Sequence, residues 1–355
     1  MNKRLDYFDI AKGIGVFLVL IGHLQGEEIF QYSPFILPVC EWIFSFHMPF
    51  FFIISGMLIC YKNDTSKDLK DTVKKRFRGI MIPYYWFSFF YMLVVFVAYF
   101  KKQIMIDTVL INLWYVICCY GMNVLWFLPA LFFAEIIFIF IMQKFDRRIS
   151  VSLISVQCAI ALIIAYILRQ GTYDSTVAEC THQLLIAVVR PFIACSFIGI
   201  GYFGFELINK KELAKVKEIF IALFLLVLGA AFVWVNHGVD FRSMVFKNVF
   251  TYYLCSCATS FGLILMCKNI KPFKFWKFLG INSLIFMAVH GSETVAYYAT
   301  RLAMWANQYL TRARGYICYT IIVCVITLYS CIMILLINKF APFVVGKKIK
   351  KKSKS

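Results

Sequence analysis

The sequence predicts an all-α, polytopic membrane protein with about ten transmembrane helices and both termini in the cytoplasm. Of its 355 residues, 62% are hydrophobic and only 15% are charged, which is too little charge to cover a soluble domain of this length. The apolar residues gather in runs near the length that a helix needs to cross a bilayer. Lys and Arg are concentrated on one side of the membrane that these runs define.

Ten apolar runs are the predicted spans. They lie near residues 10–27, 38–61, 79–100, 124–143, 149–168, 184–207, 218–236, 247–267, 278–299 and 316–338. Asp9 and Lys12 crowd the first run and no small-residue cleavage site follows it, so we expect a retained helix rather than a signal peptide. Residues 104–120 are apolar but broken; they predict an outer loop with an interfacial helix, and an eleventh span remains the alternative.

The distribution of basic residues fixes the predicted sidedness. With the N-terminus in the cytoplasm, 28 of the 37 Lys and Arg residues fall in inner segments, which are the N-terminus through Lys12, residues 62–78, 144–148, 210–217 and 268–277, and the C-terminal segment from Lys339. The net charge of +19 therefore indicates membrane orientation, and no nucleic-acid partner is expected. We expect one transmembrane domain over residues 1–340 and a basic cytoplasmic tail over 341–355 that contacts anionic headgroups of the lipid bilayer.

The thirteen cysteines do not indicate a disulfide framework or a metal centre. Most lie inside apolar runs, where Cys behaves as a small hydrophobic residue, and the metal-type spacing Cys-x-x-Cys does not occur. No metal site is expected.

Four ionisable side chains are predicted to lie at one depth in the outer half of the membrane. Helix rise places His23 roughly 20 Å and His290 roughly 18 Å above the cytoplasmic start of their spans. His47 and Arg190 come early in spans that run inward, so they fall in the same layer. Ionisable groups inside spans are costly and are usually functional, although an intramembrane His can also simply bond a neighbouring helix.

A second set of basic residues lies at the cytoplasmic face. Lys75, Arg76 and Arg78 stand at the entrance to the third span, and Lys12 points into the same layer, on the helix face that His23 shares. Arg and Lys suit phosphate binding, whereas anchoring of the span by positive charge is the alternative. A phosphorylated donor held inside and an imidazole base nearer the outside are what a reaction across a membrane requires.

Five segments resemble the acyltransferase-3 family of membrane O-acyltransferases, and within it the fucose 4-O-acetylase-like and polysaccharide O-acetyltransferases. They are FDIAKGIGVFLVLIGH, FSFHMPFFFIISGML, KKRFRGIMIPYYWFS, LWFLPALFF and FLGINSLIFMAVHG, in order and over nearly the whole chain. The resemblance implies a bacterial inner-membrane enzyme with ten core helices. It also implies acetyl-CoA as the cytoplasmic acyl donor and a glycan hydroxyl at the outer face as the acceptor.

The resemblance also implies roles for individual residues. The family's basic-x10-His signature maps onto Lys12 and His23, with Lys where many relatives have Arg. Its basic cluster maps onto Lys75, Arg76 and Arg78, where an Arg-x-x-Arg spacing reads Lys75–Arg78. We therefore expect Lys12 and this cluster to hold the CoA phosphates. His23 would accept the proton of the acceptor hydroxyl or carry the acetyl group as an acyl-imidazole.

Further expected roles complete the predicted site. Asp9, three residues before Lys12, is placed to pair with it. His47, Trp126, Arg190 and His290 would line an outer cavity and donate to the tetrahedral oxyanion. The alternative function is a membrane transporter that exports a glycan precursor or small anion, because intramembrane His and Arg suit that role as well. The two related halves that are common in transporters are not visible in the sequence.

Overall fold

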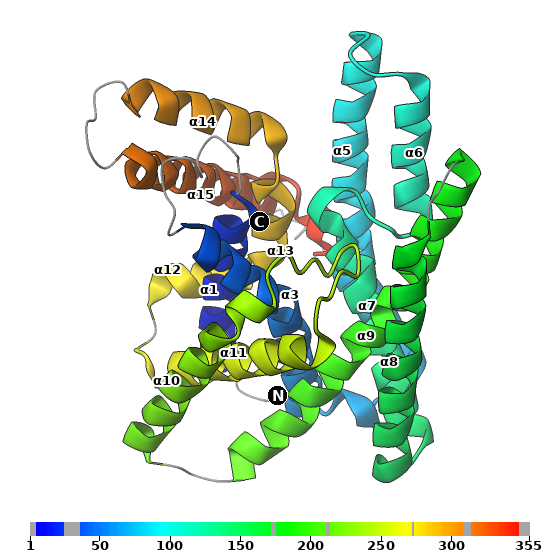
Figure 1. Cartoon of the computed structure of the whole chain (residues 1–355), viewed down its shortest axis with the longest axis vertical. Helices are drawn as coiled ribbons and strands as arrows, with labels where there is room; N and C mark the ends of the chain where they lie inside the picture. The colour runs from blue at the N-terminus through cyan, green and yellow to red at the C-terminus, as the bar shows by residue number, and fades with distance from the viewer. Residues whose placement is uncertain are drawn as a thin grey trace, which may run out of the picture. The chain divides into compact units, whose positions relative to one another are not determined.

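The computed structural model describes residues 5–24, 36–171, 175–210, 214–271, 273–307 and 314–347. Within these ranges the chain is helical apart from short connections and one isolated antiparallel bridge between Asp240 and Val245 (Figure 1). Eight helices among the described residues are long and apolar enough to cross a membrane. The predicted all-α, polytopic membrane class is confirmed.

Two of the ten predicted spans are not among these eight helices. The first, α1 (Asp6–His23), has 18 residues and carries three charged side chains in its first half. Residues 278–299 are not one helix, so the prediction of a continuous span there is wrong. The chain forms α12 (Lys274–Ile281), α13 (Ser283–His290) and α14 (Glu293–Asn307). The Asn282 amide donates to the Phe278 carbonyl, which offers the backbone an alternative to continued helix.

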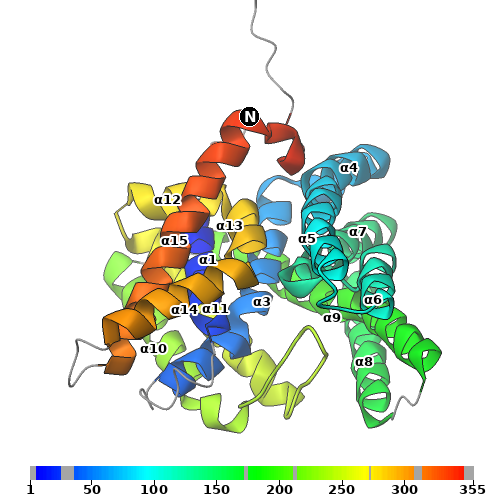
Figure 2. The ribbon, with the colours of Figure 1, turned by 90° about the horizontal axis from the view of Figure 1, so that it is seen from above.

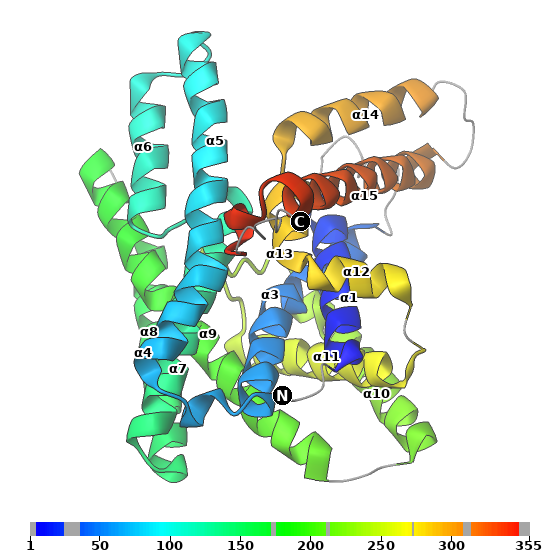
Figure 3. The ribbon, with the colours of Figure 1, turned by 180° about the vertical axis from the view of Figure 1, so that it is seen from behind.

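The described helices fall into two compact units. Unit 1 contains α1, the part of α3 up to Phe51, and α10 to α15 up to Leu336. Its remaining helix bounds are α3 (Ile36–Tyr61), α10 (Lys215–Ala231), η4 (Val233–Val235), α11 (Val249–Asn269) and α15 (Arg314–Phe340). In this unit α1 packs on α12 and α13, and α10 packs along α11 (Figures 2 and 3).

Two glycines set the close crossing of α1 and α12. A Cβ on Gly13 would overlap the backbone carbonyl of Trp276, and one on Gly280 would overlap the carbonyl of Asp9. Only glycine permits backbones to approach this closely, as in other small-residue helix contacts in membranes. Gly13 and Gly280 therefore permit this close crossing. The crossing fixes α1, which carries Asp9, Lys12 and His23.

A proline shapes α3 beside one of the candidate histidines. Pro49 lies inside the helix and has no N–H, so the carbonyl of Ser45 loses its usual donor. The hydroxyl of Ser256, from α11, donates to that carbonyl at 2.6 Å, and both serines are fully buried. The unpaired backbone group is thus satisfied by a neighbouring helix, which ties α11 to the segment that carries His47.

Unit 2 contains α3 from Phe52 onward, the helices up to α9, residues Arg242–Met244 and the end of α15. Its helix bounds are η1 (Asp64–Ser66), α4 (Leu69–Arg76), η2 (Phe77–Met81), α5 (Ile82–Phe100), α6 (Ile106–Ile117), η3 (Asn123–Trp126), α7 (Phe127–Lys144), α8 (Arg147–Gln170), α9 (Thr176–Lys210) and η5 (Pro342–Val345). In this unit α9 packs against both α7 and α8.

The helix predicted within residues 104–120 is present as α6, but it does not lie across the end of the bundle. It runs beside α5 (Figures 1 and 3), and a small apolar cluster of Met92, Val109 and Met122 joins the two. With 12 residues, α6 is roughly 18 Å long, too short to cross a bilayer core of about 30 Å. An eleventh span is therefore excluded, and α6 packs against α5.

Candidate functional site

Unit 1 brings three imidazoles together from three helices. His23 ends α1, His47 lies in α3 just before Pro49, and His290 ends α13. The ring of His23 lies 5.9 Å from that of His47 and 5.6 Å from that of His290, measured between centroids, and meets both edge-on. The histidines predicted to share one membrane layer therefore form one cluster, with His23 at its centre.

The three rings differ in exposure. His47 and His290 are buried, whereas His23 is exposed. Phe44 lies against both His23 and His47, with centroids 5.5 and 5.0 Å away, and Phe286 stacks on His290. Apolar rings thus hold the two buried imidazoles, and the accessible one is the imidazole that can meet a substrate.

Backbone contacts set the tautomers of the two buried rings. Nδ1 of His47 lies 2.9 Å from the carbonyl oxygen of Ile43, and Nδ1 of His290 lies 3.2 Å from that of Phe286. A carbonyl only accepts hydrogen bonds, so in each ring Nδ1 carries the proton and donates it. In the neutral rings Nε2 is then the nitrogen with the lone pair.

The predicted ion pair in α1 is present. Lys12 Nζ lies 3.0 Å from Asp9 Oδ1; the Asp9 side chain is buried and the Lys12 side chain is partly exposed. Spacing of three residues puts both on one helix face. Lys12 is therefore held by a buried carboxylate while part of its stem and charge stay accessible.

Arg190 belongs to unit 2, where it is 1% exposed. Its guanidinium donates to the carbonyls of Tyr120, at 3.1 Å, and Arg242, at 2.6 Å, and it lies over the ring of Trp126 at 4.8 Å. Arg190 and Trp126 were both predicted to line the site, and the structure places them side by side. Through these contacts Arg190 joins α9 to the loop before η3 and to the turn that contains Arg242.

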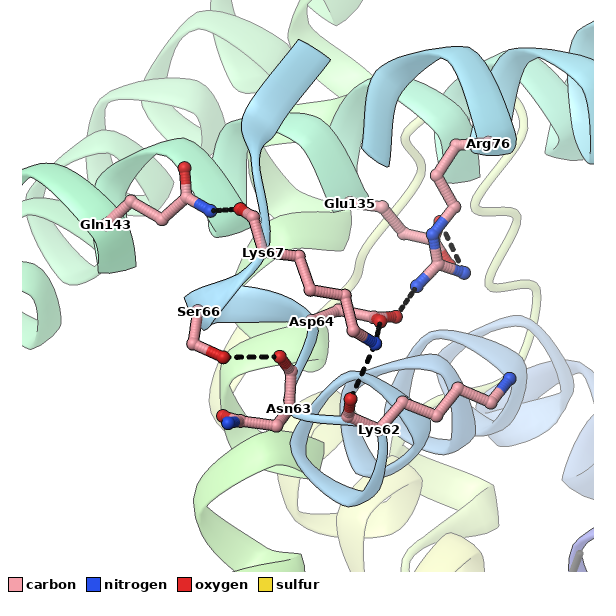
Figure 4. A network of polar contacts seen from close by, with 8 residues as sticks. All are labelled: Lys62, Asn63, Asp64, Ser66, Lys67, Arg76, Glu135 and Gln143. Carbon is pink, nitrogen blue, oxygen red and sulfur yellow. Dashed lines mark hydrogen bonds and ion pairs between the residues drawn. The ribbon is translucent and has the colours of Figure 1, made fainter. Parts of the chain in front are cut away.

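Arg76 is the centre of a buried ionic network in unit 2 (Figure 4). Its guanidinium lies 2.7 Å from Asp64 Oδ2 and 3.2 Å from Glu135 Oε2. Its side chain is 16% exposed, and both carboxylates are 3% exposed. Ser55 also donates to Glu135, and Lys67 Nζ lies 2.5 Å from Asp64 Oδ1. Two acidic groups thus already balance the charge of Arg76.

The network lowers the pKa of Asp64, which lies outside the spans. Burial on its own would raise the pKa of this carboxyl. The hydrogen bond from Lys67 and the positive charges of Arg76, Lys67 and Lys75 outweigh burial, so the net pKa shift is downward. Asp64 is therefore held ionised in the folded protein.

The other members of the predicted donor-binding cluster are exposed. Lys75 is at the end of α4, and Arg78 lies in η2, which is a π-helical turn. Pro83 lacks the N–H that would bond the carbonyl of Gly79, and the turn before it is widened accordingly. This turn directs Arg76 to the acidic pair and leaves Arg78 accessible.

Sequence reasoning assigned no role to three residues that the structure makes central to this network, Ser55, Asp64 and Glu135. Glu135 carried a signal, because a carboxylate inside an apolar run needs a partner. Asp64 carried none, since it lies in a charged loop where an acidic residue is ordinary. Among the described residues, no group of three or more His, Cys, Asp or Glu side chains is arranged to hold a metal ion.

Comparison with known proteins gives two findings. The model of the family described as "Acyltransferase domain" matches residues 5–336. Over 63 residues the chain is 46% identical to "Nodulation protein NolL" of Mesorhizobium japonicum, an alignment that covers 16% of this chain and 16% of NolL. No solved structure matches.

Proposed function

The chain belongs to the acyltransferase-3 family, and we propose that it is a membrane O-acyltransferase that transfers acetyl from cytoplasmic acetyl-CoA to a hydroxyl of a cell-surface polysaccharide or other glycan. We place it in the cytoplasmic membrane of a bacterium. The observation that carries the proposal is the cluster of three imidazoles, in which one accessible ring is flanked by two buried rings. An accessible imidazole in an apolar setting is a suitable general base for activating an alcohol.

His23 performs the proton transfers. One of its ring nitrogens takes the proton of the acceptor hydroxyl while the oxygen attacks the thioester carbonyl. The tetrahedral intermediate then collapses, the carbon–sulfur bond breaks, and His23 returns the proton to the departing thiolate. The products are the acylated glycan and CoA as its free thiol, so the base is regenerated in each cycle.

We assign binding of the acyl donor to the accessible basic residues. Arg78 and Lys75 in unit 2 are exposed, and Lys12 in unit 1 is partly exposed, so each has charge to offer to a CoA phosphate. Arg76 is already engaged by Asp64 and Glu135. Its contribution is therefore to hold the turn that presents Arg78, and Asp9 similarly orients Lys12.

The test is acyl transfer by the purified protein in lipid nanodiscs, followed as release of CoA thiol in the presence of a glycan acceptor. We expect His23→Gln to lower kcat by about 10²- to 10⁴-fold, the usual contribution of a general base. His237→Gln, at an exposed histidine that takes no part in the proposed chemistry, is the matched control and should keep the wild-type rate.

Mass spectrometry of the surface glycan from cells with and without the protein identifies the acyl group and the acceptor together. Ester-linked acetate that depends on His23 supports the proposal. Surface acetate that appears without consumption of acetyl-CoA would instead indicate export, and a His23→Gln variant with normal acetylation would remove His23 from the mechanism.

A further inference from the structure

We propose that His290 is a positioning residue for the reaction, because its Nε2 accepts a hydrogen bond from one ring N–H of His23. This fixes which nitrogen of His23 bears the lone pair that meets the acceptor hydroxyl. The inference rests on the proposed function, in which His23 is the base. It replaces the role that the sequence suggested for His290, donation to the oxyanion.

A backbone hydrogen bond fixes the tautomer of His290. Its Nδ1 donates to the carbonyl of Phe286 on its own helix. The neutral ring then has no second N–H, so it cannot donate to an oxyanion. What it offers to the cluster is the lone pair of Nε2.

The nitrogen that bears this lone pair is buried. Among the described residues, Nε2 of His290 is a buried polar atom that has no hydrogen-bond partner. Buried acceptors are nearly always satisfied in folded proteins, and an exception calls for an explanation such as a catalytic role. A histidine that served only to tie α13 to a neighbouring helix would have its second nitrogen bonded.

The position of His23 supplies the missing donor. Its ring lies 5.6 Å from that of His290, centroid to centroid, at an angle of 73°. At this separation a small rotation of the exposed His23 side chain brings a ring nitrogen within the roughly 3 Å of a hydrogen bond to Nε2. Such bonds often tighten only when substrate is bound.

The pairing has a defined consequence for the chemistry. One nitrogen of His23 keeps its proton and donates it to His290, and the other nitrogen receives the proton of the hydroxyl. The imidazolium that forms on His23 is stabilised by the lone pair of His290, as a carboxylate stabilises the histidine of a hydrolase triad. No proton needs to leave the cluster, because His23 returns its new proton to the thiolate of CoA.

Two amide substitutions test the pairing, because each one reproduces the contact of only one of the two ring nitrogens of His290. His290→Asn retains an N–H near the Nδ1 position for the Phe286 carbonyl but has no atom near Nε2. His290→Gln extends an amide oxygen toward the Nε2 position, where it can accept from His23. We expect His290→Asn to lower kcat by about 10²-fold with an unchanged KM for acetyl-CoA. We expect His290→Gln to have a kcat at least about tenfold higher than that of His290→Asn.

A purely structural role predicts the opposite order. If the ring served only through its bond to Phe286, His290→Asn would keep activity and His290→Gln would lose it, and that result overturns the inference. Thermal melting of both variants in nanodiscs checks that each is folded. Loss of activity in His23→Gln with wild-type kcat in His290→Asn would sink the inference while the proposed function stands.

A spectroscopic measurement tests the pairing without any substrate. The chain has only five histidines, so ¹⁵N-labelled imidazole resonances can be assigned by substitution. We expect His290 to be protonated at Nδ1 and unprotonated at Nε2, and its Nε2 resonance to move in His23→Gln but not in His237→Gln. A proton on Nε2, or a resonance indifferent to His23, refutes the pairing. A dependent resonance in a protein without acyl transfer would refute the proposed function alone.

Discussion

Single side chains in this protein are best understood by the charges that face them. Arg76 and Arg78 are two residues apart in the same basic segment, yet Arg76 meets Asp64 and Glu135 whereas Arg78 is exposed. A guanidinium that two buried carboxylates already neutralise has little charge left for a phosphate. The two arginines therefore have different roles, and substituting each one in turn can distinguish these roles.

The first prediction concerns Arg76. Its replacement by Gln leaves Asp64 and Glu135 buried without their counter-ion, so we expect a loss of about 3–5 kcal/mol, the usual cost of breaking a buried ion pair. Glu135→Gln in the same chain should recover part of the loss, because it removes one of the stranded charges. Melting in detergent, monitored by size exclusion, measures both effects.

The matched control for Arg76 is the exposed Lys75. Lys75→Gln should change stability by less than about 0.5 kcal/mol, as surface substitutions usually do. Arg76→Gln that melts as wild type but no longer binds acetyl-CoA would show that Arg76 is itself a phosphate ligand, contrary to the role assigned to it here.

A second prediction concerns Asp64 and pH. Since the folded protein lowers its pKa, Asp64 stabilises the fold at pH values above the ordinary Asp pKa of about 3.9, and that contribution is lost as pH falls through the lower folded-state pKa. Asp64→Asn should therefore be less stable than wild type at pH 7, and the difference should shrink below roughly pH 4. Parallel melting curves from pH 7 to 3 measure it; a constant difference would contradict the assigned shift.

At the scale of helices, the site depends on irregularities in otherwise regular elements. Pro49 removes a backbone donor from α3, and α11 supplies Ser256 in its place. This exchange ties two helices together two residues from His47. The helix that carries a candidate catalytic ring is thereby held by a side-chain bond as well as by packing.

A third prediction tests that exchange by a double-mutant cycle. Ser256→Ala leaves the buried carbonyl of Ser45 unpaired and should cost about 1–3 kcal/mol. Pro49→Ala restores a backbone N–H to the helix, so Ser256→Ala should cost less in that background. Ser66→Ala, at an exposed hydroxyl, is the control. Equal costs in both backgrounds would mean that Ser256 does not replace the missing helical donor.

Periodicity and hydropathy predict a helix and its depth, but not its partners. These patterns placed His23, His47 and His290 in one layer, and the structure gathers them, because residues at one depth on adjoining helices can meet. They also placed Arg190 in that layer, but its guanidinium instead bonds the carbonyls of Tyr120 and Arg242. Side-chain to backbone bonds between distant segments leave no period in the sequence.

The same limit explains the segment that was predicted as the ninth span. Averaged over twenty residues, the segment 278–299 is apolar, but averaging hides the local breaks. Asn282 and Gly291 each interrupt the helix, and the first bonds its own backbone. The break after α13 is also what places His290 at a helix end, beside the end of α1.

For the whole molecule, the side of the membrane on which each terminus lies depends on two segments outside the eight apolar helices, the charged α1 and the broken segment 278–299. If each apolar helix crosses the membrane, the successive apolar helices from α3 to α11 alternate in direction, and α3 runs inward when the basic segment 62–78 is cytoplasmic. With α1 and residues 278–299 both crossing, the two termini lie inside. With neither crossing, both termini lie outside, and the basic C-terminal tail faces the wrong side for its charge.

The fourth prediction follows from that difference. In a variant without native cysteines, single cysteines at Lys67, Lys274 and Lys347 should resist a membrane-impermeant maleimide in intact cells, because the positive-inside rule keeps these segments cytoplasmic. Cysteines at Lys102 and His237 should react, because they follow outward-running spans. Permeabilised cells, in which all five sites should react, control for burial. Labelling at Lys347 in intact cells would mean that α12 to α14 do not carry the chain across the membrane. His290 would then lie on the cytoplasmic side of the bilayer. There it could not assist a base that acts on a hydroxyl at the outer face.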